Sequence, residues 1–417
     1  MTSSVVEMKI RPVIKTLAKL LYIFKMKRRT IMEVKLSNQE KTQKVRQKSL
    51  IPSFVGIAAV WFGTHVGPGV ASGKQVVSYY ASFGKLGIFT PIIAMALLGL
   101  AIYFALEYSR VNKIHDFKTF TNKFFHPYEK LFSTFFEICF LVTSLLAPGL
   151  CIATSAQLLQ QFFGLNVWVG TILMVLISVI LVIYGAELVK AVSTGLTVGI
   201  LAILAIIVAL GINQGSGTIA ENWANTSFTD FPILGGLWIA ISYAGFQSTG
   251  IIGNCISVSK GLNSRRDSAK SAVLGTVLNG LMLASIVLVN YAFQPESINS
   301  LLPNYYIVQQ LGIPVLETVY VLFVTMASLS TIITFAFSLV VRFGNKELLV
   351  KNIKKERNRN LLIVLVMLIL DVIVSTFGIA QIINIGYKYL GYFSIFVVMF
   401  PFILVGIKRN KEIKLSE

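Results

Sequence analysis

The sequence predicts an all-α integral membrane protein with about ten transmembrane helices. The prediction rests on the composition, on a series of separate apolar stretches, and on the places where lysine and arginine occur. Apolar residues make up 55% of the 417 residues, and charged residues make up only 13%. A helix of about 20 apolar residues crosses a hydrocarbon core of about 30 Å. Several stretches reach that length, so the chain is expected to cross the membrane many times.

Polar residues divide the apolar sequence into ten spans. They lie at about 52–80, 87–106, 131–163, 166–184, 189–211, 231–257, 271–293, 313–341, 360–377 and 380–406. Five spans fall in residues 52–211 and five in 231–406. Because each half has an odd number of spans, the two halves must have opposite orientations in the membrane. The sequence therefore predicts one transmembrane domain, 52–406, built as a 5+5 inverted repeat, although the halves share no residue-by-residue similarity.

The basic residues predict the orientation. All but three of the 37 lysines and arginines lie in residues 1–51, in alternate loops starting near 107, 185, 258 and 342, or after Gly406. Cytoplasmic loops of membrane proteins carry an excess of these residues. We therefore expect a plasma-membrane protein whose two termini, including the tail 407–417, lie in the cytoplasm. The net charge of +19 does not indicate nucleic-acid binding, because the charges flank the spans.

The first 51 residues have a different character from the rest of the chain. Five apolar residues recur there at helical spacing among lysines: Val13, Leu17, Leu20, Leu21 and Phe24. The pattern predicts a basic helix on the inner leaflet, with anionic lipid as its partner. A disordered tail, or a translation start at Met26 or Met32, remains an open alternative.

No enzyme or metal motif is present. The sequence lacks a Gly-x-Ser-x-Gly, a His-Glu-x-x-His and a phosphate-cradling loop. Cys139, Cys151 and Cys255 lie within spans, where a thiol is usually a small packing residue. His115 and His126 lie in a basic loop with no second ligand at metal-binding spacing. We expect no catalysis, cofactor, metal centre or disulfide.

The first span contains the stretch "WFGTHVGPGVASGKQ", Trp61 to Gln75. Four glycines lower its helix propensity, and Pro68 removes a backbone donor, so the span should break near its middle. A broken backbone at membrane depth needs partners from protein, water or ligand, which makes the break a candidate binding site. A proline kink with glycine packing is the structural alternative.

The sixth span reads "GLWIAISYAGFQSTGIIGNCIS" and has a polar, glycine-containing centre from Gly245 to Thr249. It holds the position in the second half that the first span holds in the first half. Paired interruptions at equivalent positions indicate a transporter with its substrate at the membrane midplane. We therefore expect the sixth span to be broken as well.

Ten spans with broken first and sixth helices resemble the LeuT-type fold of the amino acid–polyamine–organocation superfamily. The stretch "GPGVASGKQ" is also similar to the "GAGFASGQE" signature of the YkvI-like bacterial membrane proteins. The resemblance implies a secondary transporter. It implies substrate contacts from Thr64, His65, Gly67, Gly69 and Ser72 in the first span, and from Gly245, Phe246, Gln247, Ser248 and Thr249 in the sixth. Pro68 departs from the pattern: it has no backbone amide, so the set of amides that would bind a substrate carboxylate is incomplete at this position.

The resemblance also implies a sodium site. The carbonyls of Gly63 and Val66 would supply two ligands, and the eighth span would supply Ala327, Ser330 and Thr331, which fall at i, i+3 and i+4 on one helix face. Carbonyl and hydroxyl oxygens suit a hard cation. Helix packing by small hydroxyl residues is the alternative interpretation.

Ionisable groups within spans are candidates for coupling to protons or charge. These are Lys74, His65 and Glu137, whereas Asp371, Glu317 and Lys388 are expected at solvated or interfacial positions. Lys74 and Gln75 stand where the YkvI-like signature has Gln-Glu. Lys74 would place a positive charge in the cavity, or it would snorkel outward while His65 bonds a free carbonyl.

Together these observations predict a secondary active transporter for an amino acid or similar zwitterion, with sodium or proton coupling. A sensor or structural protein that does not transport, or a channel, remains the alternative.

Overall fold

The computed structural model describes residues 52–184 and 186–416, so the predicted basic N-terminal helix lies outside the described residues. The described residues form helices and no strands. The first span consists of α2 (Ser53–His65), α3 (Pro68–Ala71) and α4 (Lys74–Tyr79). Spans two to nine are α5 (Gly84–Asn112), α7 (Glu129–Phe163), α8 (Val167–Tyr184), α9 (Ala186–Asn225), α10 (Ile233–Ser257), α11 (Arg265–Ala292), α14 (Pro314–Phe343) and α16 (Glu356–Ser375).

The last span is made of α17 (Ile379–Gln381), α18 (Lys388–Ser394) and α19 (Phe400–Ser416), joined by π-helical turns at Ile382–Tyr387 and Ile395–Met399. Four short helices lie in the connections: α6 (Phe117–Phe124), α12 (Glu296–Asn299), α13 (Pro303–Gln310) and α15 (Glu347–Asn352). Among the described residues, seven segments are long and apolar enough to cross a membrane by themselves. The prediction of a multi-spanning helical membrane protein is confirmed.

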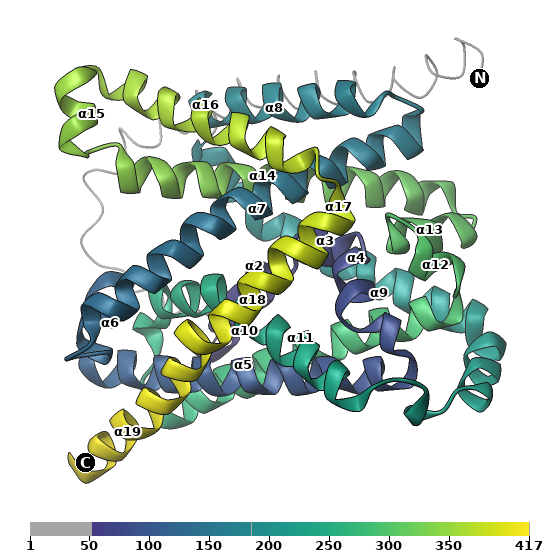
Figure 1. The fold of residues 1–417 in the computed structure, drawn as a ribbon, viewed down its shortest axis with the longest axis horizontal. Coiled ribbons are helices and arrows are strands. Elements are labelled where there is room, and N and C mark those ends of the chain that lie inside the picture. Colours follow the sequence, from purple (N-terminus) through teal and green to yellow (C-terminus); the bar gives the residue numbers. More distant parts are fainter. Residues whose placement is uncertain (1–51, 185, 417) are drawn as a thin grey trace.

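The spans group into two bodies. In one body, α2 and α5 each pack against α10 and α11; the other contains α7, α8, α14 and α16. In Figure 1, α8, α14 and α16 lie along one edge, and α5 and α11 lie along the opposite edge. Each body combines equivalent spans of the two halves, namely one, two, six and seven, or three, four, eight and nine. This pairing is what a 5+5 repeat requires.

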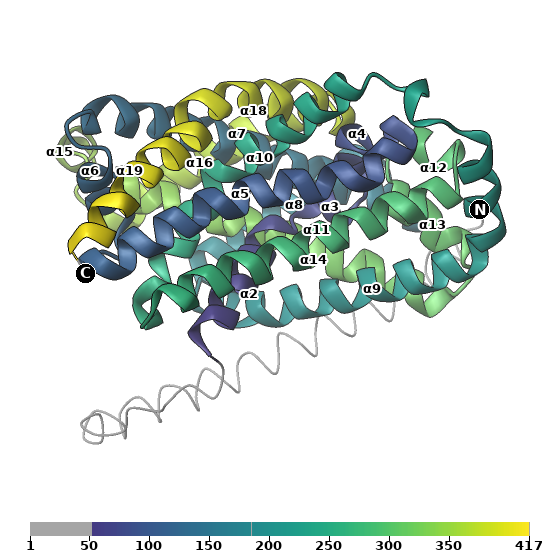
Figure 2. The same cartoon turned by 90° about the horizontal axis from the view of Figure 1, so that it is seen from below.

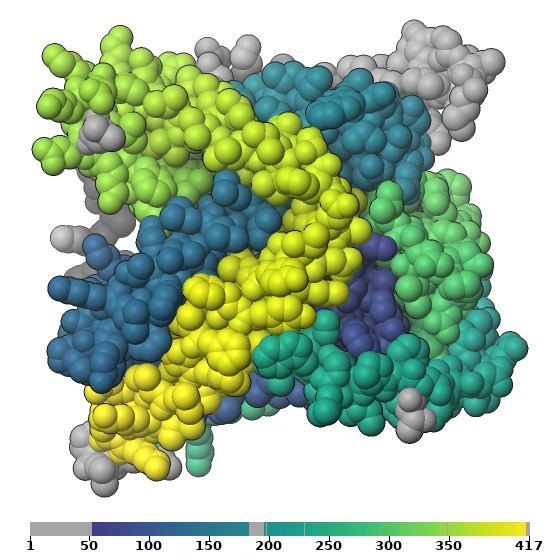
Figure 3. All heavy atoms as spheres, in the orientation of Figure 1, coloured from purple at the N-terminus to yellow at the C-terminus, as the bar shows by residue number. Residues whose placement is uncertain are grey.

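The remaining spans connect the two bodies. Helix α9 packs against α11 of one body and α14 of the other. The last span runs diagonally across one face of the molecule, where atoms of the first span are visible between it and the α12–α13 segment (Figure 3). Figure 2 shows that α4 lies near α12 and α13, at the end of the molecule opposite α19.

The predicted break in the first span is confirmed. Helix α2 ends at His65, Gly67 is extended (φ −85°, ψ 178°), and Pro68 is the first residue of α3. A proline is well accommodated at this position, because the amide of a first helical residue has no partner within its helix. A second interruption follows at Gly73, whose φ of +84° is in the left-handed region that favours glycine.

The sixth span is not broken, contrary to the expectation from its sequence. Helix α10 runs without interruption through Gly245 and Thr249. The glycine serves close packing instead: a Cβ on Gly245 would lie 2.7 Å from the carbonyl oxygen of Gly391 in α18, and one on Gly391 would lie 2.5 Å from the carbonyl oxygen of Ser242. The backbones of α10 and α18 therefore touch where both lack a side chain.

Candidate functional site

The site is centred on His65, the last residue of α2 before the break. Its side chain is only 2% exposed and lies between two other helices. His65 Nδ1 is 2.6 Å from Asn279 Oδ1 of α11, and His65 Nε2 is 2.7 Å from the Tyr243 hydroxyl of α10. The rings of His65 and Tyr243 meet edge to face, with their centroids 5.6 Å apart.

The partners determine which nitrogen carries the proton. The Asn279 amide nitrogen donates to the Gly275 carbonyl at 2.8 Å, so its oxygen faces His65 as an acceptor. His65 Nδ1 must therefore donate, and in the neutral imidazole Nε2 accepts from Tyr243. Gln247, one turn further along α10, hydrogen bonds to the Tyr243 phenol. The result is a buried hydrogen-bonded chain across α10, α2 and α11.

Past the break, the first span has different partners. The Asn304 amide of α13 donates to the Ser72 carbonyl at 2.9 Å, and its side-chain nitrogen donates to the Ala71 carbonyl at 2.9 Å. The Tyr320 hydroxyl of α14 donates to the same Ala71 carbonyl at 2.8 Å. Thus α2 is bonded to α10 and α11, whereas the segment after the break is bonded to α13 and α14.

The break leaves backbone acceptors free. The carbonyl oxygens of Gly63, Thr64 and Val66 accept no hydrogen bond from any residue that the structure describes. In a continuous helix the Gly63 and Thr64 carbonyls would accept from residues 67 and 68. Here the Gly67 amide donates to the His65 carbonyl instead (2.9 Å), and Pro68 has no amide hydrogen. Free carbonyls within an apolar region require a ligand, water or an ion.

Other residues predicted in the first span lie as follows. The Thr64 hydroxyl donates to the Val60 carbonyl (2.8 Å), and the Ser72 hydroxyl donates to the Gly69 carbonyl (3.1 Å). A Cβ on Gly69 would lie 2.5 Å from Gln75 Oε1, so the Gln75 amide packs directly on this glycine. Gln75 Nε2 is buried and has no hydrogen-bond partner among the described residues.

The residues predicted in the sixth span are buried in α10. Ser248 donates to the Gly245 carbonyl (2.6 Å) and Thr249 donates to the Phe246 carbonyl (2.8 Å), so both hydroxyls are satisfied within their own helix. The Phe246 ring stacks on Tyr387, with centroids 4.1 Å apart. Of this group, Gln247 is joined to the His65 chain, through Tyr243.

The eighth span approaches the first through α14 and α3. The Thr331 hydroxyl donates to the Ala327 carbonyl at 3.0 Å and also has the Cys151 thiol of α7 as a partner. Ala327 is buried, and Ser330 and Thr331 are half-buried. The assignment of Ala327, Ser330 and Thr331 as sodium ligands remains a prediction.

Two predicted coupling residues have partners away from the break. Lys74 Nζ donates to the Ser300 carbonyl at 2.7 Å and to the Ile298 carbonyl at 3.4 Å, at the end of α12. Glu137 forms an ion pair with Arg342, whose guanidinium also lies 4.5 Å from the Phe140 ring centre. The Lys74 ammonium therefore lies at α12, away from the break, and Glu137 joins α7 to α14; coupling roles for both remain predictions.

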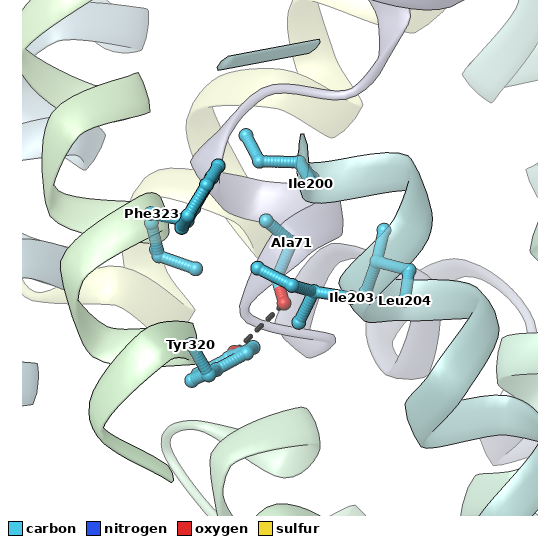
Figure 4. Close-up of a pocket in the computed structure, with 7 residues that line it drawn as sticks. Ala71, Ile200, Ile203, Leu204, Tyr320 and Phe323 are labelled. Carbon is cyan, nitrogen blue, oxygen red and sulfur yellow. Dashed lines mark hydrogen bonds between the residues drawn. The ribbon is translucent and has the colours of Figure 1, made fainter. Parts of the chain in front are cut away.

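A small apolar cavity lies beside the break, between α3, α9 and α14 (Figure 4). It is lined by Ala71, Ile200, Ile203, Leu204, Tyr320, Phe323 and Val324. None of the predicted substrate-binding residues lines it. Most of those residues are buried, whereas Thr64 and Gly67 are half-buried, and a Cβ on Gly67 would meet no atom within 4 Å.

Several polar residues of the site were not predicted from the sequence. They are Tyr243, Asn279, Asn304 and Tyr320. Asn279 carried the clearest signal, because an amide in the middle of an apolar span requires a partner.

The chain is similar in fold to solved transporter structures. Over 87% of this chain and 91% of the other, it matches a Na⁺-coupled sialic acid symporter in a substrate-bound outward-open state, at 13% identity and a TM-score of 0.57. It also matches Mhp1, a nucleobase–cation-symport-1 family transporter, in a closed conformation with bromovinylhydantoin bound. That match covers 82% of this chain and 75% of the other, at 15% identity and a TM-score of 0.51. No protein-family model and no curated protein matches the chain. The two bodies, the broken first span and these likenesses together show that the chain has the LeuT-type fold of multi-spanning membrane proteins.

Proposed function

We propose that the protein is a secondary active transporter that moves a small solute by alternating access. One observation carries this proposal: the break at Val66 and Gly67 separates a half-helix bonded to α10 and α11 from a segment bonded to α13 and α14. Transporters change access when one body moves against the other, and a few residues at element ends absorb the rotation. The break has the position and the partners of such a hinge.

We propose an amino acid or a related zwitterion as the solute. The free carbonyls of Gly63, Thr64 and Val66 suit an ammonium group, and the unpartnered Gln75 Nε2 is a donor for a carboxylate. A site with donors and acceptors on one short segment favours a solute that carries both charges. The similarity of "GPGVASGKQ" to the YkvI-like signature supports membership of that family as part of the same proposal.

The test is uptake into proteoliposomes of a panel of labelled amino acids, with labelled sugars for comparison, under imposed sodium or proton gradients. Gln75→Leu should abolish uptake of the solute that the parent accumulates. Gln160→Leu replaces an exposed glutamine of α7 and should leave uptake unchanged. Failure of the parent to accumulate any member of the panel would refute the zwitterion assignment.

Sodium is the proposed coupling ion at Gly63, Val66, Ala327, Ser330 and Thr331, where it would be a co-transported substrate. Ser330→Ala together with Thr331→Ala removes two hydroxyl oxygens and keeps most of the packing. The double variant should lose any stimulation of uptake by sodium. A parent protein without a sodium response would direct the assignment to protons.

Accessibility separates transport from the alternative functions. A cysteine at Thr64 or Thr249 should react with membrane-impermeant reagents alternately from the two sides, depending on solute and ion. Simultaneous reactivity from both sides would indicate a channel. Reactivity that never changes with solute or ion would indicate a sensor or structural protein.

A further inference from the structure

Asp371, about one turn before the C-terminal end of α16, is completely buried in the membrane domain. Its relative exposure is 0%, and neither carboxylate oxygen has a hydrogen-bond partner within the part of the chain that the structure describes. The sequence suggested a solvated or interfacial position. The structure differs because α16 packs against α7, α8 and α14, and α17 begins a few residues later, so the end of the helix is covered.

The surroundings of Asp371 are apolar. A cluster of buried apolar side chains joins α16 to the helices packed around it: Val364, Met367 and Leu368 of α16 lie with Cys151, Ile152, Met174 and Ile332. Packing between α7 and α16 is tight, since a Cβ on Gly149 would lie 2.6 Å from Val374 and 3.1 Å from the Asp371 carbonyl oxygen. Bulk water therefore has no direct contact with the carboxyl group in this conformation.

Few titratable groups face Asp371. On α7 the Cys151 thiol interacts with it electrostatically, and Tyr387 of the last span lies near that thiol. The charged groups of α14 are at its ends, where Glu317 accepts a hydrogen bond from Tyr305 and Arg342 pairs with Glu137. Helix α8 carries no charged residue, and α15, with Glu347 and Lys351, packs near the other end of α16. No cation among the described residues is positioned to neutralise the carboxylate.

An ionised carboxylate in this position would be strongly disfavoured. Removing it from water without a partner costs several kcal/mol. Uptake of one proton from the solvent, in a conformation that water reaches, removes this penalty, because the carboxylate becomes a neutral acid.

We propose that Asp371 is a proton-binding site, protonated in this conformation and deprotonated in a conformation that admits water to the junction of α7 and α16. The proton is the only ligand that the site needs. A sodium ion would require several oxygen ligands, whereas neither carboxylate oxygen has a polar partner within hydrogen-bonding distance in the described part of the chain. The coupling of this proton to solute movement rests on the proposed transport function; the protonation itself does not.

Infrared difference spectroscopy between acidic and alkaline buffer tests the protonation. The purified parent protein should show the carbonyl band of a buried carboxylic acid, and Asp371→Asn should lose it. Glu317→Gln, which changes a carboxyl group that already has a hydrogen-bonding partner, should keep the band. Asp371→Glu retains a titratable group and should keep a shifted band, which separates loss of the acid from general misfolding.

Two results would overturn the proton assignment. One is an identical set of bands in the parent and in Asp371→Asn. The other is a band that is absent in sodium buffer and appears only in choline buffer, which would mean that the carboxylate binds sodium.

Labelling tests the coupling without any knowledge of the solute. The parent with Thr249→Cys should react with an impermeant thiol reagent at a rate that changes with pH beyond the change due to ionisation of the thiol itself, and adding Asp371→Asn should leave only the thiol's own dependence. The three native cysteines are buried and provide the background measurement. An unchanged pH dependence would overturn the coupling role. Amino-acid uptake that persists in Asp371→Asn with its response to a pH gradient intact would do the same, while leaving the proposed transport function in place.

Discussion

The Tyr243 hydroxyl donates a 2.7 Å hydrogen bond to His65 Nε2, and this bond joins the sixth span to the residue at which α2 ends. The two residues are 178 positions apart in the sequence. Because Asn279 holds the other ring nitrogen, the imidazole is fixed between two helices of the same body. The end of α2 is therefore expected to move together with α10 and α11.

Removing the Tyr243 hydroxyl should destabilise the folded protein. Tyr243→Phe leaves His65 Nε2 as a buried acceptor without a donor, which costs about 1–3 kcal/mol. Thermal unfolding in mild detergent should show a clear decrease in the unfolding temperature. Tyr128→Phe, at a residue whose ring is 66% exposed, should have almost no effect. Equal unfolding temperatures for Tyr243→Phe and the parent would show that the hydrogen bond contributes nothing.

The close contact between Gly245 and Gly391 leads us to expect that a larger residue at position 245 destabilises the protein. Gly245→Ala places a methyl group 2.7 Å from a carbonyl oxygen, so α10 and α18 must separate, at a cost of about 1–3 kcal/mol. Gly250→Ala in the same helix meets no atom within 4 Å, and it should stabilise the helix by up to about 1 kcal/mol through higher helix propensity. Unfolding of the two variants by a graded detergent series should move in opposite directions. A Gly250→Ala variant as unstable as Gly245→Ala would show that helix packing is not the cause.

Asn304 should hold the first span past its break. Asn304→Ala removes the donor to the Ala71 carbonyl and exposes α3 to fluctuation, with a loss of about 1–3 kcal/mol. Hydrogen exchange of peptides covering residues 68–79 should become faster, while peptides from α10 should be unaffected. Asn299→Ala changes an exposed asparagine of α12 and is the matched control. Unchanged exchange in the Asn304 variant would argue against the proposed anchoring.

Asp116 supplies a pH-dependent contribution outside the spans. Its side chain begins α6 and accepts a 2.7 Å hydrogen bond from the Thr119 amide; hydrogen bonds from Thr119 lower the pKa of Asp116 below its usual value. Because the folded pKa is depressed, the stabilisation is complete above the unfolded pKa and is lost as pH falls through the folded pKa. Asp116→Asn keeps a capping side chain but should remove this acid sensitivity, as followed by hydrogen exchange in α6. A parent and variant with the same acid sensitivity would contradict the assignment.

Much of the fold could be predicted from the sequence, because hydropathy and length determine where a helix can cross a bilayer. The break in the first span was also predictable, since Pro68 lacks the donor that a continuous helix needs at that point. The glycines of the sixth span were ambiguous. Gly245 lowers helix propensity whether or not the helix breaks, and only the position of Gly391 shows that it serves packing.

The polar contacts of the site could not be derived from the sequence. His65 was singled out, but its partners Tyr243 and Asn279 lie on other spans, and no local pattern specifies which helix faces which. Asp371 illustrates the same difficulty. Its distance from the end of a span suggested exposure, whereas its burial depends on how α17 and α7 cover that end.

Under the proposed transport function, the different partners of the two parts of the first span have a consequence for the order of events in a transport cycle. A single rigid rod would have to open one side of the membrane in the same motion that closes the other. Two short segments that meet at Val66 and Gly67 can move one after the other, with an intermediate in which both sides of the membrane are closed. A cross-link that fixes one segment should therefore leave the opposite side of the protein able to open.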